Sequence, residues 1–273
     1  MKLETISLRA DEPDITLTAY VADDPGVRDA MLVIPGGGYS VVCSDREGEP
    51  IALAFMAQGY NCFVLHYSVG PRAKFPRPLV EASIAMKEIR ARAKEWKIDP
   101  EHIHAVGFSA GGHLCAMLGN LWNLPEVERL AGIEHGENKP RGVALIYPVI
   151  SAGKNAHRGS IVTLVGDPNA PQSAYEQVSI EKQIGPHSAP AFLMHTANDQ
   201  VVPVLNSLLA AEAYAANHIH FELHVYPDAP HGIALANELT AGGYAPFINP
   251  RIARWVGDAA DFFRGLDSYA EKY

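Results

Sequence analysis

Short apolar runs alternate with amphipathic stretches along most of this chain. The apolar runs cover residues 31–34, 62–65, 103–106, 143–147, 191–195 and 221–226. Most of them are apolar at nearly every position, as expected for strands of a parallel sheet that helices cover on both faces. Between them, residues 79–96, 204–216 and 252–263 repeat apolar positions at helical spacing. This alternation predicts an α/β fold with a mostly parallel central sheet and helices on both faces.

Two local signals predict further elements near the N-terminus. Residues 15–21 alternate between apolar and polar side chains and, with residues 3–8, predict an N-terminal antiparallel hairpin. The sequence Ser-Asp-Arg-Glu at 44–47 has the form of a capping box leading into a helix over 50–58, with Gly59 as its C-terminal stop.

No repeat, low-complexity tract or linker divides the 273 residues, so we expect a single domain over residues 1–273. The less regular stretch 151–189 lies between two predicted strands and is expected to form at most a small insertion or lid. A chain of this length buries enough surface to need no disulfide or metal for stability.

Composition argues against several classes of protein. The net charge is −9 and no long basic cluster is present, so nucleic acid is not an expected partner. No apolar run reaches the ~18 residues of a membrane span, and the N-terminus lacks a signal-peptide pattern, which together predict a cytoplasmic protein away from membranes. Three widely spaced cysteines without a C-x-x-C pair indicate free thiols and no zinc site.

A Gly-x-Ser-x-Gly motif spans residues 107–111, between the predicted strand 103–106 and a small-residue helix at 112–118. Glycines on both sides of the serine let strand and helix pass closely in a strained turn, which is the context of a nucleophile elbow. Ser109 would project from the sheet edge at a helix N-terminus, where free N–H groups can stabilise an oxyanion. An ordinary glycine turn is the alternative, because both residue types are common.

A serine nucleophile needs a base and an acid that orients the base, and each has a candidate downstream. Asp199 directly follows the predicted strand 191–195, and His231 follows the last strand and precedes a glycine. The order Ser, Asp, His is one of the orders known for such triads. Asp199 could instead cap the helix that begins near residue 203, and His231 could be a surface-loop histidine. Asp228 is an alternative orienting acid.

The loop after the predicted strand 31–34 reads Pro-Gly-Gly-Gly-Tyr over residues 35–39. Three glycines let a backbone approach a substrate carbonyl, so N–H groups of this loop, with that of Ala110, are candidates for an oxyanion hole. A phosphate-binding loop is the alternative, but neither G-x-G-x-x-G nor G-x-x-x-x-G-K-[ST] is present. The missing dinucleotide fingerprint also argues against an NAD-linked enzyme.

Together these segments resemble the α/β-hydrolase esterases, and most of all the small bacterial acetyl-esterase and acetyl-xylan-esterase branch related to the hormone-sensitive-lipase group. The resemblance is carried by residues 35–39 and 107–113, by Asp199 and by His231 with its following glycine. Residues 44–49 and 147–150 also look like segments of that branch. The resemblance extends from about residue 30 to the C-terminal helix.

The resemblance implies an α/β-hydrolase fold and a serine esterase that needs no metal or cofactor. Ser109 would be the nucleophile, His231 the base and Asp199 the acid that orients it. The family further implies a small-molecule ester as substrate, with O-acetyl groups on sugars or xylo-oligosaccharides as the expected targets.

The resemblance also implies that the backbone N–H groups of Gly37, Gly38 and Ala110 form the oxyanion hole. Two departures from the hormone-sensitive-lipase group stand out. Pro35 replaces the histidine that usually precedes the glycines, and the large N-terminal helical cap is absent. Both departures weaken any inference about long acyl chains, and neither affects the predicted triad.

Pocket walls and alternative functions complete the interpretation. We expect the substrate-binding Tyr39 and the loops 68–78, 151–189 and 232–250 to surround the site, because each follows the carboxyl end of a strand. A feruloyl esterase and a prolyl-oligopeptidase-like peptidase are the alternative enzymes, although such a peptidase usually carries a further domain. A non-catalytic binding module would be expected to lack a triad member. Exposed edge strands are compatible with a homodimer.

Overall fold

The computed structural model describes residues 1–270, and its centre is one eight-stranded sheet. The strands are β1 (Lys2–Ser7), β2 (Thr16–Val21), β3 (Arg28–Ile34), β4 (Asn61–His66), β5 (Ile98–Phe108), β6 (Val143–Ile146), β7 (Ala191–Thr196) and β8 (Phe221–Tyr226). Their order in the sheet is β1-β2-β4-β3-β5-β6-β7-β8. Strands β3 to β8 run parallel, whereas β1 and β2 form an antiparallel hairpin that adds to β4. The predicted α/β class, the six internal strands and the hairpin are confirmed.

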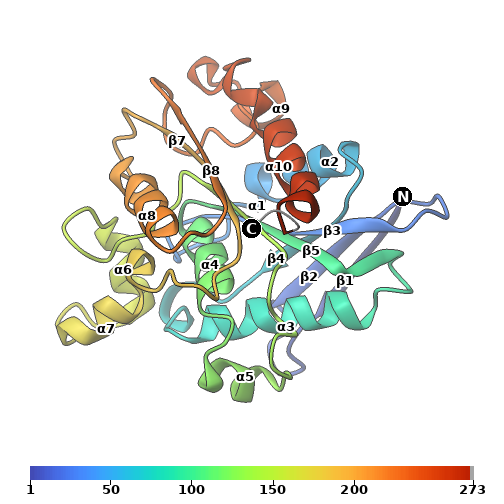
Figure 1. The fold of residues 1–273 in the computed structure, drawn as a ribbon, viewed down its shortest axis with the longest axis horizontal. Helices are drawn as coiled ribbons and strands as arrows, with labels where there is room; N and C mark the ends of the chain where they lie inside the picture. The colour runs from blue at the N-terminus through green and yellow to red at the C-terminus, as the bar shows by residue number, and fades with distance from the viewer. Residues whose placement is uncertain (271–273) are drawn as a thin grey trace.

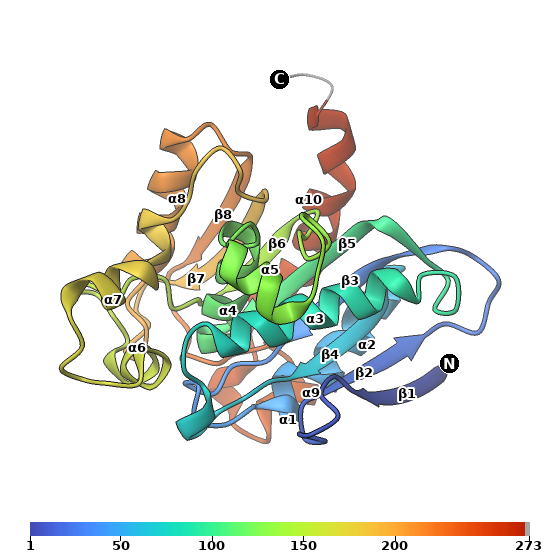
Figure 2. The ribbon, with the colours of Figure 1, turned by 90° about the horizontal axis from the view of Figure 1, so that it is seen from below.

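Helices cover both faces of this sheet (Figures 1 and 2). They are α1 (Ser44–Glu47), α2 (Glu49–Ala57), α3 (Arg77–Ala91), α4 (Ser109–Asn120), α5 (Pro125–Ala131), α6 (Arg158–Val165), α7 (Gln172–Gln177), α8 (Leu205–Ala216), α9 (Glu238–Ala241) and α10 (Trp255–Ala270), with short 3₁₀ turns η1 (Gly70–Arg72), η2 (Ile180–Lys182), η3 (Ala245–Phe247) and η4 (Ile252–Arg254). Buried side chains of α3, α4 and α8 form one core with the sheet. Those of α2 and α10 form the second core on the opposite face.

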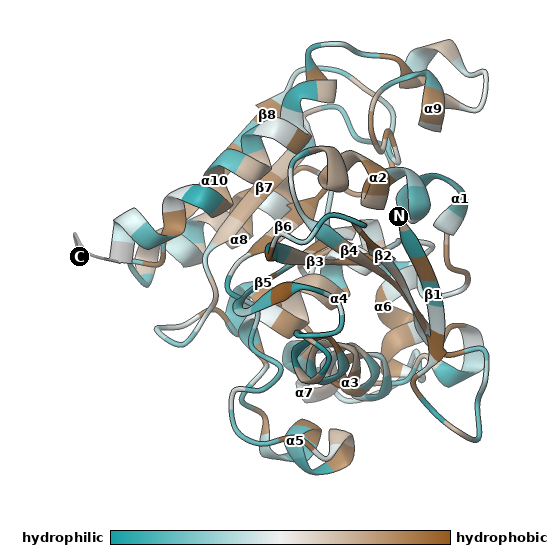
Figure 3. Ribbon diagram, turned by 90° about the vertical axis from the view of Figure 1, so that its right-hand side faces the viewer, coloured by the Kyte–Doolittle hydropathy of each residue, from teal (hydrophilic) through white to brown (hydrophobic). Residues whose placement is uncertain are grey.

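The strands are apolar because both of their faces are buried. Every residue of β6 and β7 is inaccessible or nearly so, and in Figure 3 the central strands are mostly brown. Helix α10 alternates between teal and brown in the same view, as a helix with one face on the core and one in solvent should. Trp255 and Phe263 of α10 lie in the second core. There the ring centroids of Trp255 and of Phe55 from α2 are 5.9 Å apart.

The register of the parallel strands brings their carboxyl ends to one edge of the sheet. Ile34 of β3 pairs with Gly107 of β5, and Phe108 of β5 pairs with Ile146 of β6. The segments that follow these strands therefore begin next to one another, although they are far apart along the chain. This edge is where loops of an open α/β sheet usually form a binding crevice.

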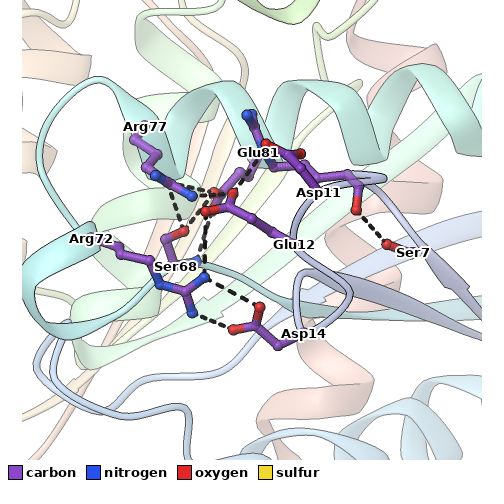
Figure 4. Close-up of polar contacts among 9 residues, drawn as sticks. Ser7, Asp11, Glu12, Asp14, Ser68, Arg72, Arg77 and Glu81 are labelled. Atoms are coloured by element: carbon purple, nitrogen blue, oxygen red, sulfur yellow. Dashed lines mark hydrogen bonds and ion pairs between the residues drawn. The ribbon is translucent and has the colours of Figure 1, made fainter.

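A network of charged side chains holds the N-terminal hairpin against the loop that follows β4 (Figure 4). Glu81 of α3 is fully buried and accepts hydrogen bonds from the backbone N–H of Ser68 at 2.7 Å and from its hydroxyl at 2.6 Å. Arg77 donates to Glu81 at 3.1 Å and also pairs with Glu12 in the hairpin turn, which Arg72 reaches at 3.6 Å. Burial of Glu81 is tolerated because its carboxylate is fully paired.

Two local predictions around the first helices differ from the structure. The predicted capping box is wrong, because α1 begins at Ser44 without a side-chain cap and Ser44 Oγ instead contacts His66 Nε2 at 2.9 Å. The fourth residue of that motif, Glu47, is buried rather than folded back on the helix start. The helix predicted over residues 50–58 and its glycine stop are confirmed as α2, which is followed by Gly59 at a φ of 102°.

The helix predicted over residues 79–96 is shorter than its apolar repeat. Helix α3 ends at Ala91, and the buried Trp96 lies in the turn that leads into β5. The indole of Trp96 packs on Phe63 and donates to Glu4 at 3.3 Å, so the side chain follows the core pattern without a helical backbone. The apolar periodicity identified the buried positions correctly, but it predicted a helix that extends beyond the observed end of α3.

The stretch 151–189 holds α6, α7 and the 3₁₀ turn η2. Ile161, Tyr175 and Ile180 from these elements belong to the same core as the sheet. The segment therefore packs against the main body of the fold. Whether it acts as a lid stays a prediction.

Candidate active site

Ser109 lies in a sharp turn between β5 and α4. Its φ is 52°, a left-handed conformation that costs a non-glycine residue energy and occurs where the surrounding structure enforces it. A Cβ atom at Gly107 would lie 2.3 Å from the carbonyl oxygen of Gly111, and one at Gly111 would lie 2.2 Å from that of Pro35. Any side chain at Gly107 or Gly111 would therefore collide with a neighbouring backbone carbonyl. This close backbone approach is the geometry of a nucleophile elbow.

Three side chains from three different loops form a continuous hydrogen-bonded chain at the carboxyl edge of the sheet. His231 Nε2 lies 2.8 Å from Ser109 Oγ, and His231 Nδ1 lies 2.6 Å from Asp199 Oδ2. An ionised carboxylate can only accept, so Nδ1–H donates to Asp199 and Nε2 is left to accept from the serine hydroxyl. The structure thus brings together the three residues singled out in the sequence, in the tautomer that a general base requires.

The surroundings of Asp199 keep its carboxylate ionised. Its Oδ1 accepts from the backbone N–H groups of Val201 at 2.8 Å and Val202 at 2.9 Å. Burial raises the pKa of Asp199, but hydrogen bonds from His195 and His231 outweigh burial and hold that pKa well below its usual range. One carboxylate oxygen of Asp199 therefore accepts N–H groups of the loop before α8, and the other orients His231.

The alternative orienting acid lies elsewhere. Asp228 is exposed, and its carboxylate accepts a hydrogen bond from the side-chain amide of Asn198. Asn198 Oδ1 in turn accepts from the N–H of Ala229 at 3.2 Å. This pair joins the loop after β7 to the loop after β8, and so holds Asp199 and His231 in neighbouring loops.

The glycine loop after β3 lies beside Ser109 with its backbone in left-handed conformations. Gly37 has a φ of 125° and Gly38 a φ of 66°. Within residues 1–270, the N–H groups of Gly37, Gly38 and Ala110 donate to no protein acceptor. Ala110 lies in the first turn of α4, where N–H groups have no partner within the helix. These three donors are free for a ligand oxygen.

Glu47 and Tyr147 hold this edge together and were not recognised in the sequence as site residues. Glu47 accepts from the N–H of Gly36 at 2.8 Å and from the hydroxyl of Tyr147 at 2.9 Å. The Tyr147 hydroxyl also accepts from the N–H of Ala234 at 3.1 Å, and its ring lies 5.0 Å from that of His231. Burial raises the pKa of Glu47, and the two hydrogen bonds it accepts oppose that rise. The pair connects the glycine loop to the histidine loop.

The signal for Glu47 was present in the sequence but was interpreted differently. A glutamate three residues after a serine fits a capping box, whereas this one is 2% exposed and faces a backbone N–H eleven residues earlier. Tyr147 has a φ of 38° directly after β6, a strained position that no sequence pattern marks.

Tyr39 is a correction. We predicted that its side chain would bind substrate, but it has no exposed surface and its hydroxyl contacts Nδ1 of the buried His113 at 2.9 Å. His113 Nε2 donates to the carbonyl of Val178 at 2.8 Å. The aromatic ring therefore lies in the core, where the buried His113 satisfies its hydroxyl, and the backbone of Tyr39 has a left-handed φ of 58°.

A cleft of about 600 Å³ opens next to His231. Its walls come from the loop after β7, the loop after β8 and the segment around η3, which lies in the predicted wall 232–250. The stretch 151–189 touches the other side of the site, since a Cβ at Gly38 would lie 3.8 Å from Ser160 Oγ at the start of α6. The predicted wall 68–78 does not line this cleft.

His157, just before α6, also lies near the triad. Its Nδ1 contacts Ser160 Oγ at 2.8 Å. Burial lowers the pKa of His157, and the nearby His231 lowers it further.

Across residues 1–270 no cluster of three or more His, Cys, Asp or Glu side chains is arranged to hold a metal ion. Over the same residues, no helix combines the length and apolarity that crossing a membrane would require.

The sheet order, the elbow after β5 and the Ser–His–Asp arrangement define an α/β-hydrolase fold with a serine-hydrolase type of site. The chain belongs to the BD-FAE family, whose model matches residues 18–214.

Similar proteins of known type support this assignment. The chain is 39% identical over 238 residues to endo-1,4-beta-xylanase B of Butyrivibrio fibrisolvens, covering 84% of this chain and 36% of that protein. It is 27% identical over 232 residues to an acetylxylan esterase of Xylanibacter ruminicola, covering 82% of this chain and 44% of that protein. The chain thus spans less than half the length of these two relatives.

A solved structure matches along nearly the whole chain. The acetyl ester-xyloside bifunctional hydrolase of Caldicellulosiruptor lactoaceticus superposes with a TM-score of 0.81 and 32% sequence identity, covering 97% of this chain and 96% of that one. The likeness therefore extends over nearly the whole length of both chains.

Proposed function

We propose that this protein is a serine ester hydrolase that removes short acyl groups, and in particular O-acetyl groups from sugars or xylo-oligosaccharides. The observation that carries the proposal is the unbroken chain from Ser109 through His231 to Asp199, with distances of 2.8 and 2.6 Å. The free N–H groups of the glycine loop and of α4 stand beside it. No metal or cofactor is needed for the reaction that these groups perform.

The reaction proceeds through an acyl-enzyme. His231 Nε2 takes the proton of Ser109 as Oγ attacks the ester carbonyl, and Asp199 stabilises the imidazolium that forms. The N–H groups of Gly37, Gly38 and Ala110 hold the tetrahedral oxyanion, each contributing about 3–4 kcal/mol to the barrier reduction. His231 then protonates the leaving alcohol, and water activated by the same nitrogen releases the acid.

The choice of substrate is supported by the relatives. One is named as a xylanase, one as an acetylxylan esterase and a third as an acetyl ester-xyloside hydrolase. Acetyl groups are small, and within residues 1–270 the elements before β3 are the strands β1 and β2, with no helix there that could cover a long acyl chain. A cytoplasmic location and a homodimer stay predictions.

Acetate release from acetylated xylo-oligosaccharides tests the proposal, alongside p-nitrophenyl esters with acyl chains of two, four and eight carbons. We expect acetate release from the sugars and the highest kcat/KM for the two-carbon ester. No turnover of any short ester would refute the esterase. Good turnover of p-nitrophenyl acetate without acetate release from the sugars would refute the sugar substrate and leave the esterase intact.

A further inference from the structure

The cleft beside His231 lies on one side of the triad. Its walls include Asn198 and Gln200 from the loop after β7, and Tyr244, Phe247 and Asn249 from the segment around η3. None of the glycine-loop residues and none of the α6 residues lines it. The cleft is therefore separate from the free N–H groups beside Ser109.

The position of the cleft beside His231 indicates which part of an ester it can bind, the acyl group or the alcohol. The carbonyl oxygen must reach the N–H groups of the glycine loop, whereas the leaving oxygen must reach His231 Nε2 to receive a proton. Because the cleft is bounded by His231 and not by the glycine loop, a group that fills it is attached to the leaving oxygen. An acyl chain would extend from the carbonyl carbon, away from the histidine.

The cleft offers aromatic surface to its occupant. Tyr244 is 56% exposed and meets the ring of Phe247 edge-on, with centroids 5.3 Å apart. The guanidinium of Arg46 lies 5.9 Å from the Phe247 ring and supports it from the α1 side. Phe247 is partly exposed and adds apolar ring surface, while Tyr244 has an apolar ring and a polar hydroxyl that suit a ligand with both apolar and polar faces. A pyranose ring is such a ligand, since its C–H groups form an apolar face and its hydroxyls a polar rim.

Apart from His231, the polar side chains that line the cleft are neutral or negative, and Arg46 is not among the lining residues. The side-chain amide of Asn249 accepts backbone hydrogen bonds from Arg251 at 3.1 Å and Ile252 at 3.3 Å through its oxygen. Within residues 1–270 its NH₂ group donates to no acceptor of the protein, so it is available for a hydroxyl. The exposed carboxylate of Asp228 also lines the cleft, and no lysine or arginine does. This charge pattern favours an uncharged alcohol over an anionic one.

We propose that this cleft is the subsite for the leaving alcohol and that it takes an uncharged sugar ring, which stacks on Tyr244 and Phe247. The inference rests on the proposed esterase function and adds to it the side of the site that recognises carbohydrate.

The test compares three esters on the variants Tyr244→Ala, Phe247→Ala and the double variant. Acetylated xylobiose has a sugar as alcohol, ethyl acetate has a two-carbon alcohol without a ring, and methyl ferulate has its ring on the acyl side. We expect KM for acetylated xylobiose to rise about tenfold in each single variant and further in the double variant. The ratio of its kcat/KM to that of ethyl acetate should fall by the same factor.

Two variants control for the fold and for the ring itself. Tyr244→Phe keeps the aromatic surface and should retain most of the selectivity for the sugar ester. Leu239→Ala removes another exposed apolar side chain from the neighbouring helix α9, 62% exposed and outside the cleft, and should leave the ratio unchanged.

Three outcomes would overturn the subsite. The first is an unchanged ratio in the double variant, and the second is an equal loss on acetylated xylobiose and ethyl acetate. The third is a loss confined to methyl ferulate, which would assign the rings to the acyl group. Failure of the esterase itself is seen separately, because the wild-type protein would then hydrolyse none of the three esters.

Discussion

The two edges of the central sheet each carry a cavity, and they differ in what the surrounding polar groups do. The cavity at the amino-terminal edge is the larger, about 810 Å³, and is lined by Arg90, Lys139, Arg141 and neighbouring residues. The cleft at the carboxyl edge has about 600 Å³. At the amino edge, Arg90 donates to backbone carbonyls and Arg141 pairs with Asp267 at 2.6 Å. Through these contacts Arg90 and Arg141 join segments that are distant along the chain.

The carboxyl edge is organised for a ligand instead. Its side chains converge on the Ser109 hydroxyl, and backbone donors beside that hydroxyl have no protein partner within the described residues. The larger volume belongs to the cavity at the amino edge, so volume does not identify the candidate active site. Convergent polar groups with unsatisfied donors are the better guide to a site than volume.

The left-handed residue that lines the amino-edge cavity also differs in its setting from those beside the triad. At the amino edge, His218 follows the end of α8 with a φ of 58°, an ordinary way to end a helix. At the carboxyl edge, Ser109 and Tyr147 have φ values of 52° and 38° directly after strands. Strand ends have no helical hydrogen bonding that favours this conformation, so the surrounding packing must enforce it.

Among variants that test the difference between the two edges, Ser109→Ala should have the largest effect. We expect kcat on p-nitrophenyl acetate to fall roughly 10⁵-fold, because the nucleophile is lost while the oxyanion donors remain. Steady-state and burst kinetics measure it. Lys139→Ala at the amino-edge cavity is the matched control and should change kcat less than twofold. Comparable losses in both variants would remove the distinction between the edges.

Asp199→Asn is expected to have the next largest effect, with kcat reduced about 10⁴-fold. The amide can donate to His231 Nδ1, which would place the proton on Nε2 and leave no acceptor for the serine hydroxyl. Asp228→Asn serves as the control and should cost less than threefold on the same ester. A mild effect of Asp199→Asn with a large effect of Asp228→Asn would exchange their roles.

Glu47→Ala sharpens the comparison, since it removes a buried group that touches neither Ser109 nor His231. Loss of the bond to Gly36 should let the glycine loop shift, and we expect kcat to fall about 100-fold with a small change in KM. Glu47→Gln keeps one accepting oxygen and should recover much of the rate. Equal rates for both variants, or a rise confined to KM, would show that Glu47 does not position the loop.

The smallest effect concerns stability rather than rate. Burial lowers the pKa of His113 to about 4, so the unfolded chain binds a proton below pH 6.5 that the folded protein does not. The contribution of His113 to the free energy of unfolding should therefore be fully present above pH 6.5 and decrease by on the order of 3 kcal/mol towards pH 4. Urea denaturation at several pH values measures this slope, and His113→Gln should flatten it. An unchanged slope in that variant would place the acid sensitivity elsewhere.

Much of the fold was predictable because its signals are local. Runs of apolar residues marked six strands, and alternation over residues 15–21 marked the hairpin, since burial on one or two faces leaves a periodic trace in a short window. The elbow and the order of Ser109, Asp199 and His231 were visible for the same reason. Each follows a strand, and parallel strands present their carboxyl ends at one edge.

Contacts between distant residues were not predictable in this way. Glu47 meets Tyr147 across 100 positions, and Tyr39 turns into the core towards His113, 74 positions away. A local window assigns such side chains to the nearest helix or loop, because it cannot include the partner that satisfies a buried polar group. The chain order of the residues therefore specified the candidate nucleophile, base and acid. Three-dimensional packing set their hydrogen bonds and decided which aromatic rings lie in the core and which line the cleft.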